Sequence, residues 1–162
     1  MHSDARGVFQ EAYNKQTLLE LGIDTVMVQD NQSVSQRGVL RGMHLQRKPH
    51  AMAKLVRVSH GSIQDIIVDC RPDSASYGKH LSVILTAKQG NQLFVPRGCA
   101  HGFLALEDNT VVNYKCDNYY APQSEAGFNA LSPELDLPWQ ITEGVLQSDR
   151  DAALPDYKDF AL

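Results

Sequence analysis

The chain has 162 residues, of which 43% are hydrophobic and 21% charged, and this suits one globular domain with a sizeable core. Its formal net charge of −4 gives no electrostatic reason to expect a nucleic acid or an anionic membrane as partner. No apolar run approaches the ~20 residues that span a bilayer, and no apolar signal segment opens the chain, so a cytoplasmic protein is predicted.

The first half of the chain is predicted to form one short helix and several strands. Residues 15–22 are typical of a helix closed by Gly22, and residues 25–33 alternate briefly before a polar turn. Residues 37–46 begin at a glycine turn and read as a strand, although Arg41 and His44 interrupt its apolar residues. Residues 53–70 read as two strands joined at a glycine.

The second half continues with short strands bounded by Gly, Asp or Asn, at 80–88, 91–96, 101–108 and 110–120. The chain then becomes Pro-rich and irregular, and residues 148–155 read as a single helical turn with Ser148 as its N-cap. Many short strands, little helix and no linker favour one β-sandwich or barrel domain over residues 1–162. The three cysteines, Cys70, Cys99 and Cys116, form no Cys-x-x-Cys pair and are predicted to be buried, reduced thiols.

Two segments have the spacing of the paired motifs of cupin barrels. The second motif is "GNQLFVPRGCAH" at 90–101, in which a tight Pro-Arg-Gly turn leads His101 into a strand. The first runs from Gly38 through His44 to Lys54. Alternation along a strand sends His44 and Gln46 to the same face, so the geometry of a cupin site is kept.

The ligand chemistry of a metal-binding cupin is not kept. Gln46 and Lys54 stand where such a cupin has a second histidine and a glutamate. A lysine ammonium repels a divalent cation, and glutamine replaces imidazole poorly. We therefore predict no metal, and a barrel interior in which His44, Lys54 and His101 supply a base and a cation.

Five segments in order, "RGVLRGMHLQ", "AKLVRVSHGSIQDIIVDCR", "VPRGCAHGFLAL", "YKCDNYYAP" and "SDRDAALP", resemble the dTDP-4-dehydrorhamnose 3,5-epimerase family, the RmlC-type sugar-nucleotide epimerases. The match runs from about Arg6 to about Pro155. It implies an all-β, cupin-like double-stranded β-helix (a jelly-roll barrel) with short peripheral helices, a homodimer, and catalysis without metal or cofactor. The implied reaction converts dTDP-4-dehydro-6-deoxy-D-glucose to dTDP-4-dehydro-L-rhamnose, by epimerisation at C3 and C5, on the route to dTDP-L-rhamnose.

Such a reaction needs a base, an acid on the opposite side of the sugar, and a group that stabilises the enolate oxygen. The resemblance implies that His44 is the base, Asp151 orients it, Tyr114 is the general acid and Lys54 places positive charge near the enolate. Without the resemblance, His44 is an ordinary strand histidine, Asp151 a solvated acid, Lys54 a snorkelling lysine and Tyr114 a half-buried strand tyrosine.

The resemblance also implies a set of substrate contacts. Tyr120 matches a tyrosine that stacks on the thymine base, with the neighbouring Tyr119 as the competing choice. Strict alternation puts Arg41 on the opposite face from His44, so its predicted contact requires a bulge at Gly42 or a ligand held by the other subunit. The implied substrate-binding residues are Arg6, Glu11, Gln29, Asp30, Asn31, Arg41, Lys54, His101, Tyr120, Glu125 and Arg150.

The sequence departs from the family pattern in three places. The family's first N-terminal strand, which normally helps to form the dimer, is expected to be missing ahead of Arg6. Leu45 follows the histidine where an aromatic residue is common, and Asn129 lies where the pattern has Arg-Trp. Three alternatives therefore stay open: a single-site 3- or 5-epimerase, an inactive sugar-nucleotide-binding cupin, and a metal-dependent cupin oxygenase or isomerase.

Overall fold

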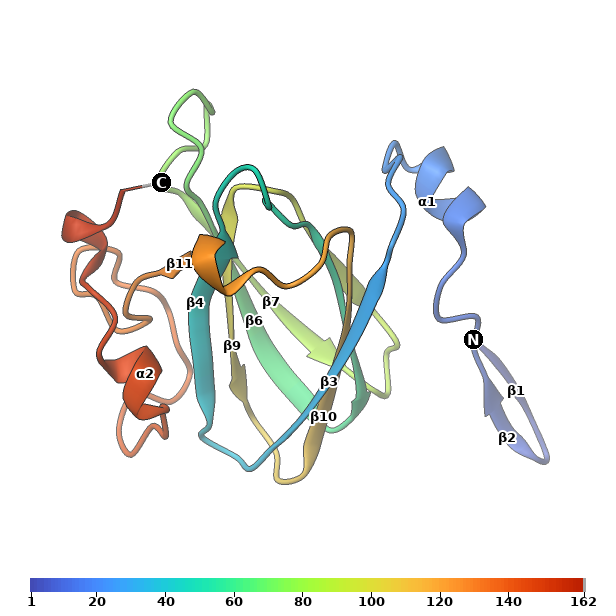
Figure 1. The fold of residues 1–162 in the computed structure, drawn as a ribbon. Coiled ribbons are helices and arrows are strands. Elements are labelled where there is room, and N and C mark those ends of the chain that lie inside the picture. Colours follow the sequence, from blue (N-terminus) through green and yellow to red (C-terminus); the bar gives the residue numbers. More distant parts are fainter. Residues whose placement is uncertain (162) are drawn as a thin grey trace.

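The computed structural model describes residues 1–161, and most of them form a barrel of two antiparallel sheets (Figure 1). The first sheet has the order β3-β10-β5-β8 and the second β11-β4-β9-β6-β7. These strands are β3 (Gln29–Ser35), β4 (Leu40–Gln46), β5 (Lys54–His60), β6 (Ser62–Asp69), β7 (His80–Thr86), β8 (Gln92–Val95), β9 (Cys99–Ala105), β10 (Thr110–Cys116) and β11 (Glu125–Gly127). The predicted all-β, cupin-like barrel is confirmed.

The remaining elements are short and peripheral. They are the hairpin strands β1 (His2–Asp4) and β2 (Gly7–Phe9), the helices α1 (Lys15–Glu20) and α2 (Asp149–Ala152), and the 3₁₀ turns η1 (Pro122–Ser124) and η2 (Tyr157–Asp159). Both helices were predicted, and Ser148 caps α2 because its hydroxyl accepts a hydrogen bond from the N–H of Asp151. No helix within residues 1–161 has the length and apolarity needed to cross a membrane.

Two local predictions were wrong. The polar turn expected at the end of residues 25–33 is instead strand β3, which pairs along its whole length with β10. Backbone pairing at a sheet edge does not require apolar side chains, so polarity alone misled the prediction. The segment after Ala121, expected to be irregular, contains the three-residue strand β11, which pairs with β4.

Strand register divides the barrel interior into an apolar end and a polar end. Val58 pairs with Val112, and both belong to a buried cluster that spans the two sheets. Four residues further along the same strands, Lys54 pairs with Cys116. Because inward positions recur every two residues, the apolar cluster forms a floor below the polar side chains. The outer face of β4 is covered separately by the chain after β11, including the buried Trp139.

The hairpin β1–β2 lies outside the barrel (Figure 1). All six of its strand residues are exposed, including Val8 at 65% and Phe9 at 70%. A hairpin that buries no apolar face is marginally stable alone in water. The hairpin therefore leaves the apolar side chains of Val8 and Phe9 free to pack against another surface.

Candidate active site

A histidine–carboxylate pair lies on the inner side of strand β4. The Nε2 atom of His44 is 2.8 Å from Oδ1 of Asp151, which α2 carries across to β4. The Asp151 side chain is 7% exposed and that of His44 is 30% exposed. A buried carboxylate thus fixes one ring nitrogen, while the other side of the ring stays accessible. The sequence-predicted pair is brought together.

The backbone of β4 is shaped around this pair at Gly42. Its N–H donates to Oδ2 of Asp151 over 3.1 Å, so both carboxylate oxygens have partners. Gly42 has φ +116°, and a Cβ atom there would lie 2.6 Å from Cα of Gly102 on β9. Only glycine fits such a close approach and such a φ angle. The register of β4 against β9 shifts between Arg41 and His44, as the predicted bulge requires.

Two opposing influences act on the pKa of Asp151. Burial alone would raise the pKa, but the hydrogen bond and positive charge of His44 and the N–H of Gly42 lower it below the usual value. The carboxylate is therefore charged at neutral pH. It can hold the imidazole in one orientation and stabilise the imidazolium that forms when His44 takes a proton.

A second histidine–carboxylate pair faces the first across the sheet. His101 on β9 pairs in register with His44, and its Nε2 lies 2.6 Å from Oδ1 of Asp65 on β6. Asp65 is fully buried, and its Oδ2 has no hydrogen-bond partner among residues 1–161. Burial lowers the pKa of His101, although Asp65 opposes this effect. Sequence reasoning missed Asp65; the signal was one acidic residue inside the apolar run "SIQDIIV".

Lys54 and Tyr114 lie next to each other on the four-stranded sheet. The Nζ atom of Lys54 is 5.9 Å from the centre of the Tyr114 ring. Burial lowers the pKa of Lys54, while Cys116, Asp65 and Glu125 oppose that change. Burial is also the main cause that raises the pKa of Tyr114, so its hydroxyl carries a proton at neutral pH.

His44, Lys54 and Tyr114 line a cavity of about 110 Å³ between the two sheets, whereas His101 and Asp151 lie behind its lining. It brings together residues from both sheets and from the segment after β10. The lining residues are Gln29, Asn31, His44, Leu45, Gln46, Met52, Lys54, Tyr114, Tyr120 and Glu125. Seven of them are sequence-predicted site residues, namely Gln29, Asn31, His44, Lys54, Tyr114, Tyr120 and Glu125. Eight of the ten lining residues have polar or charged side chains, which suits a ligand rich in oxygen.

Tyr120, Glu125 and Arg150 form a linked group at the mouth of this cavity. The Tyr120 hydroxyl donates to Oε2 of Glu125 over 2.5 Å, and Nη2 of Arg150 lies 2.5 Å from the same oxygen. Burial would raise the pKa of Glu125, but these two partners lower it below its usual value. Tyr119, the competing choice, is 66% exposed and lines no part of the cavity.

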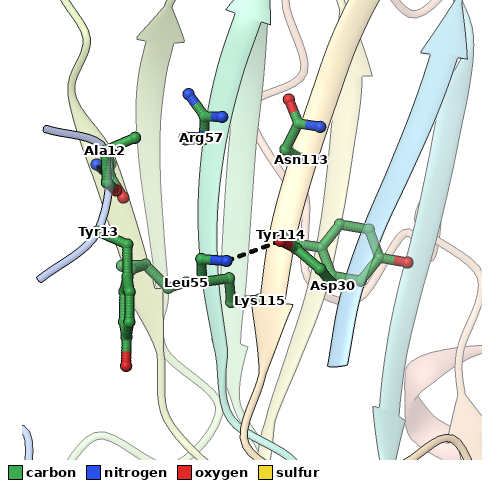
Figure 2. Close-up of a pocket in the computed structure, with 9 residues that line it drawn as sticks. Ala12, Tyr13, Asp30, Leu55, Arg57, Asn113, Tyr114 and Lys115 are labelled. Carbon is green, nitrogen blue, oxygen red and sulfur yellow. Dashed lines mark hydrogen bonds and ion pairs between the residues drawn. The ribbon is translucent and has the colours of Figure 1, made fainter. Parts of the chain in front are cut away.

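Asp30 lies on the other side of the sheet from the cavity. Alternation along β3 turns Gln29 and Asn31 inward and Asp30 outward. Figure 2 shows Asp30 joined to Lys115 on the outer face, where their charged atoms are 2.7 Å apart, close to Tyr13. The Asp30 side chain is therefore not part of the cavity that His44, Lys54 and Tyr114 line.

Arg41 lies beside the site and does not line the cavity. It is exposed, and its Nε donates to the Ser35 hydroxyl over 3.2 Å. Its charge nevertheless acts to lower the pKa of Tyr114, against the larger effect of burial.

Arg6 and Glu11 lie far from the cavity within the same chain. The Arg6 side chain is 90% exposed in the turn of the β1–β2 hairpin and pairs only with Asp4 among residues 1–161. Glu11 is exposed beside α1. Within one chain, these two predicted contacts are not part of the site.

Comparison with known proteins adds the family. A family model described as dTDP-4-dehydrorhamnose 3,5-epimerase matches residues 1–159. The Escherichia coli (strain K12) enzyme of that name is 43% identical over 93% of this chain and 82% of its own length. The chain belongs to the dTDP-4-dehydrorhamnose 3,5-epimerase family.

Solved structures of the family have the same fold. The Bacillus anthracis dTDP-4-dehydrorhamnose 3,5-epimerase, with TDP and PPi bound, has a TM-score of 0.91 and 44% identity, covering 94% of this chain and 87% of its own. The Legionella pneumophila dTDP-6-deoxy-D-glucose-3,5-epimerase, in complex with dTDP-4-keto-L-rhamnose, has a TM-score of 0.90 and 41% identity, covering 94% and 81%.

Proposed function

We propose that this protein, as a single epimerase domain, inverts C3 and C5 of dTDP-4-dehydro-6-deoxy-D-glucose to give dTDP-4-dehydro-L-rhamnose. The observation that carries the proposal is one cavity bounded by the His44–Asp151 pair and by Tyr114, with Lys54 beside the tyrosine. A base, an acid and a cation around one cavity are what epimerisation next to a ketone needs. The family of the chain supports the same reaction.

The base in this mechanism is His44. Its Nε2 is held by Asp151, so Nδ1 is the nitrogen left to remove a proton from the sugar. The electron pair of the broken C–H bond moves toward the C4 ketone and leaves an enolate. Asp151 stabilises the imidazolium through its charge and its hydrogen bond.

Tyr114 returns a proton to carbon on the opposite face. Its raised pKa keeps the phenol protonated until the enolate forms. The positive charge of Lys54 stabilises the developing negative charge on the enolate oxygen. His44 then loses its proton to solvent and Tyr114 regains one, so the net reaction is an isomerisation.

The sugar nucleotide is held at the mouth of the cavity in this proposal. Tyr120 offers an aromatic face to the base and is 51% exposed, while Arg41 and Arg150 supply positive charge for the diphosphate. The Legionella structure has the sugar nucleotide dTDP-4-keto-L-rhamnose bound, and the Bacillus structure has TDP and PPi bound.

We also propose that the working form is a homodimer. The β1–β2 hairpin exposes Val8 and Phe9 and carries Arg6 at its turn. Docking of the hairpin on a second copy would bury this apolar surface and bring Arg6 and Glu11 toward the partner's cavity. Arg6 and Glu11, which lie far from the cavity of their own chain, would then contact the substrate of the partner.

Proton NMR of the substrate with the enzyme in heavy water tests the function. Deuterium at both C3 and C5 supports the 3,5-epimerase, whereas deuterium at one carbon would identify a single-site epimerase. No exchange by a folded, dTDP-binding protein would identify a sugar-nucleotide-binding cupin. The assembled His44–Asp151 pair argues against that last outcome, because a binding protein needs no oriented base.

A further inference from the structure

We propose that Gln46 is a positioning residue that sets the affinity for the nucleotide by fixing the main chain on both sides of Tyr120. This inference rests on the proposed function, in which the Tyr120 ring stacks on the base. Gln46 lines the cavity but is only 5% exposed, and both polar atoms of its side chain are bound to main-chain groups, so it acts through Tyr120.

The hydrogen bonds of Gln46 carry the argument. Its Oε1 accepts the N–H of Ala121 over 2.7 Å. Its Nε2 donates to the carbonyl of Tyr119 over 3.2 Å and to the carbonyl of His50 over 2.7 Å. One side-chain amide therefore holds a donor and an acceptor that flank Tyr120, and it also holds the loop after β4.

A second glutamine, on the other sheet, also binds the main chain of this segment. Oε1 of Gln29 on β3 accepts the N–H of Tyr120 over 2.9 Å. Three main-chain groups of residues 119–121 are thus held by two side chains from opposite sheets of the barrel. This fixes the direction in which the Tyr120 side chain leaves the chain, with its hydroxyl on Glu125.

Only an amide of this length satisfies the arrangement. A main-chain segment offers both N–H and C=O, so the side chain that holds it must both accept and donate. A carboxylate would place negative charge against two carbonyl oxygens, and an alkyl side chain would leave buried polar groups without partners. Glu125 also pairs in register with Gln46, so the residue that holds the main chain of 119–121 is adjacent to the mouth of the cavity.

Titration calorimetry with dTDP and steady-state kinetics test the proposal through Gln46→Leu. The expected result is that the Kd for dTDP and the KM for the sugar nucleotide rise about tenfold, while kcat changes by less than about twofold. In a Tyr120→Ala background the same substitution should add less than about twofold to the Kd, because the group being positioned is already gone. Equal losses in both backgrounds, or an unchanged Kd, would overturn the proposal.

Gln64 offers a matched control. It is a buried glutamine of β6 whose amide donates to Ser82 and Pro138 and accepts from the N–H of Gln140, away from the cavity. Gln64→Leu should lower the melting temperature without changing the Kd for dTDP, whereas a raised Kd would mean that any lost buried amide has this effect and would overturn the proposal. If Gln46→Leu does not fold, Gln46→Glu, which keeps the shape and loses the donors, is expected to raise the Kd in the same way.

The two proposals fail in different ways. A wild-type protein that neither binds dTDP nor exchanges sugar protons would overturn the proposed function and this inference together. A wild-type protein that does both, with a Gln46→Glu Kd equal to its own, would overturn the role of Gln46 alone.

Discussion

The carboxylate of Asp151 lies 2.8 Å from the imidazole of His44, although the two residues are 107 positions apart in the sequence. Asp151→Asn should therefore lower kcat by at least about 100-fold, because the amide neither orients the neutral imidazole correctly nor stabilises the imidazolium. Deuterium exchange at C3 and C5 measures the loss. Asp149→Asn, at the exposed first residue of the same helix, is the control and should leave the rate unchanged.

The same carboxylate makes stability depend on pH. The pKa of Asp151 is lower in the folded protein than in the unfolded chain, so its contribution is present above the ordinary value near 3.8 and is lost as pH falls through the folded pKa. Urea unfolding should show the wild type losing its advantage over Asp151→Asn as pH falls below about 4. A constant difference between pH 3 and pH 7 would contradict this account.

Removing the base and removing the acid should have different consequences. His44→Ala should abolish deuterium exchange at both carbons, since no proton leaves the sugar without the base. Tyr114→Phe keeps the ring and loses only the hydroxyl, so exchange at one carbon or more should persist while net epimerisation falls. NMR follows both quantities in one sample. Full activity of His44→Ala would show that another group is the base.

The close approach of β4 and β9 at Gly42 predicts that a larger residue there would destabilise the fold. Gly42→Ala should destabilise the fold by about 1–3 kcal/mol, because the new Cβ meets the β9 backbone and φ is unfavourable for alanine. Gly144 also has a positive φ, but nothing lies within 4 Å of a Cβ there. Gly144→Ala is thus the control, and the difference between the two in urea unfolding measures the close approach together with the less favourable φ of +116° against +69°.

The short strands and the turn residues that bound them, such as Gly61 between β5 and β6, predicted a sandwich or a barrel, and the spacing of the two cupin motifs favoured the barrel. The sequence did not predict β3 as a strand, because the polar residues of that edge strand carry no hydrophobic period. The His44–Asp151 pair was predicted only from the family resemblance, since no local sequence pattern links His44 to a helix far along the chain. Asp65 required the register of β6 against β9, which the sequence does not contain.

The burial of the three cysteines predicts slow reaction of their thiols in the folded protein. Cys70, Cys99 and Cys116 are free and buried, and burial raises the pKa of Cys70 and of Cys116 to about 11. The thiolate is the reactive species, so the native protein should react with a chromogenic disulfide far more slowly at pH 8 than the urea-unfolded chain. Rapid reaction of one thiol in the native state would show that its part of the barrel opens readily.

The last prediction concerns the hairpin and a second copy of the chain. Arg6 is remote from its own cavity, so we expect it to act on the cavity of a partner. A heterodimer made by co-expressing Arg6→Glu with His44→Ala chains, each with its own tag, would then contain one intact site. That site combines the barrel of the Arg6→Glu chain with the hairpin of the His44→Ala chain.

About half of the wild-type rate per dimer is therefore expected from this heterodimer at low substrate concentration, while each variant homodimer should be nearly inactive. Light scattering of the same samples establishes the oligomeric state. A dimeric but inactive heterodimer would mean that Arg6 serves its own chain. Such a result would require the hairpin to fold back across the barrel, where the exposed Val8 and Phe9 would then find their contacts.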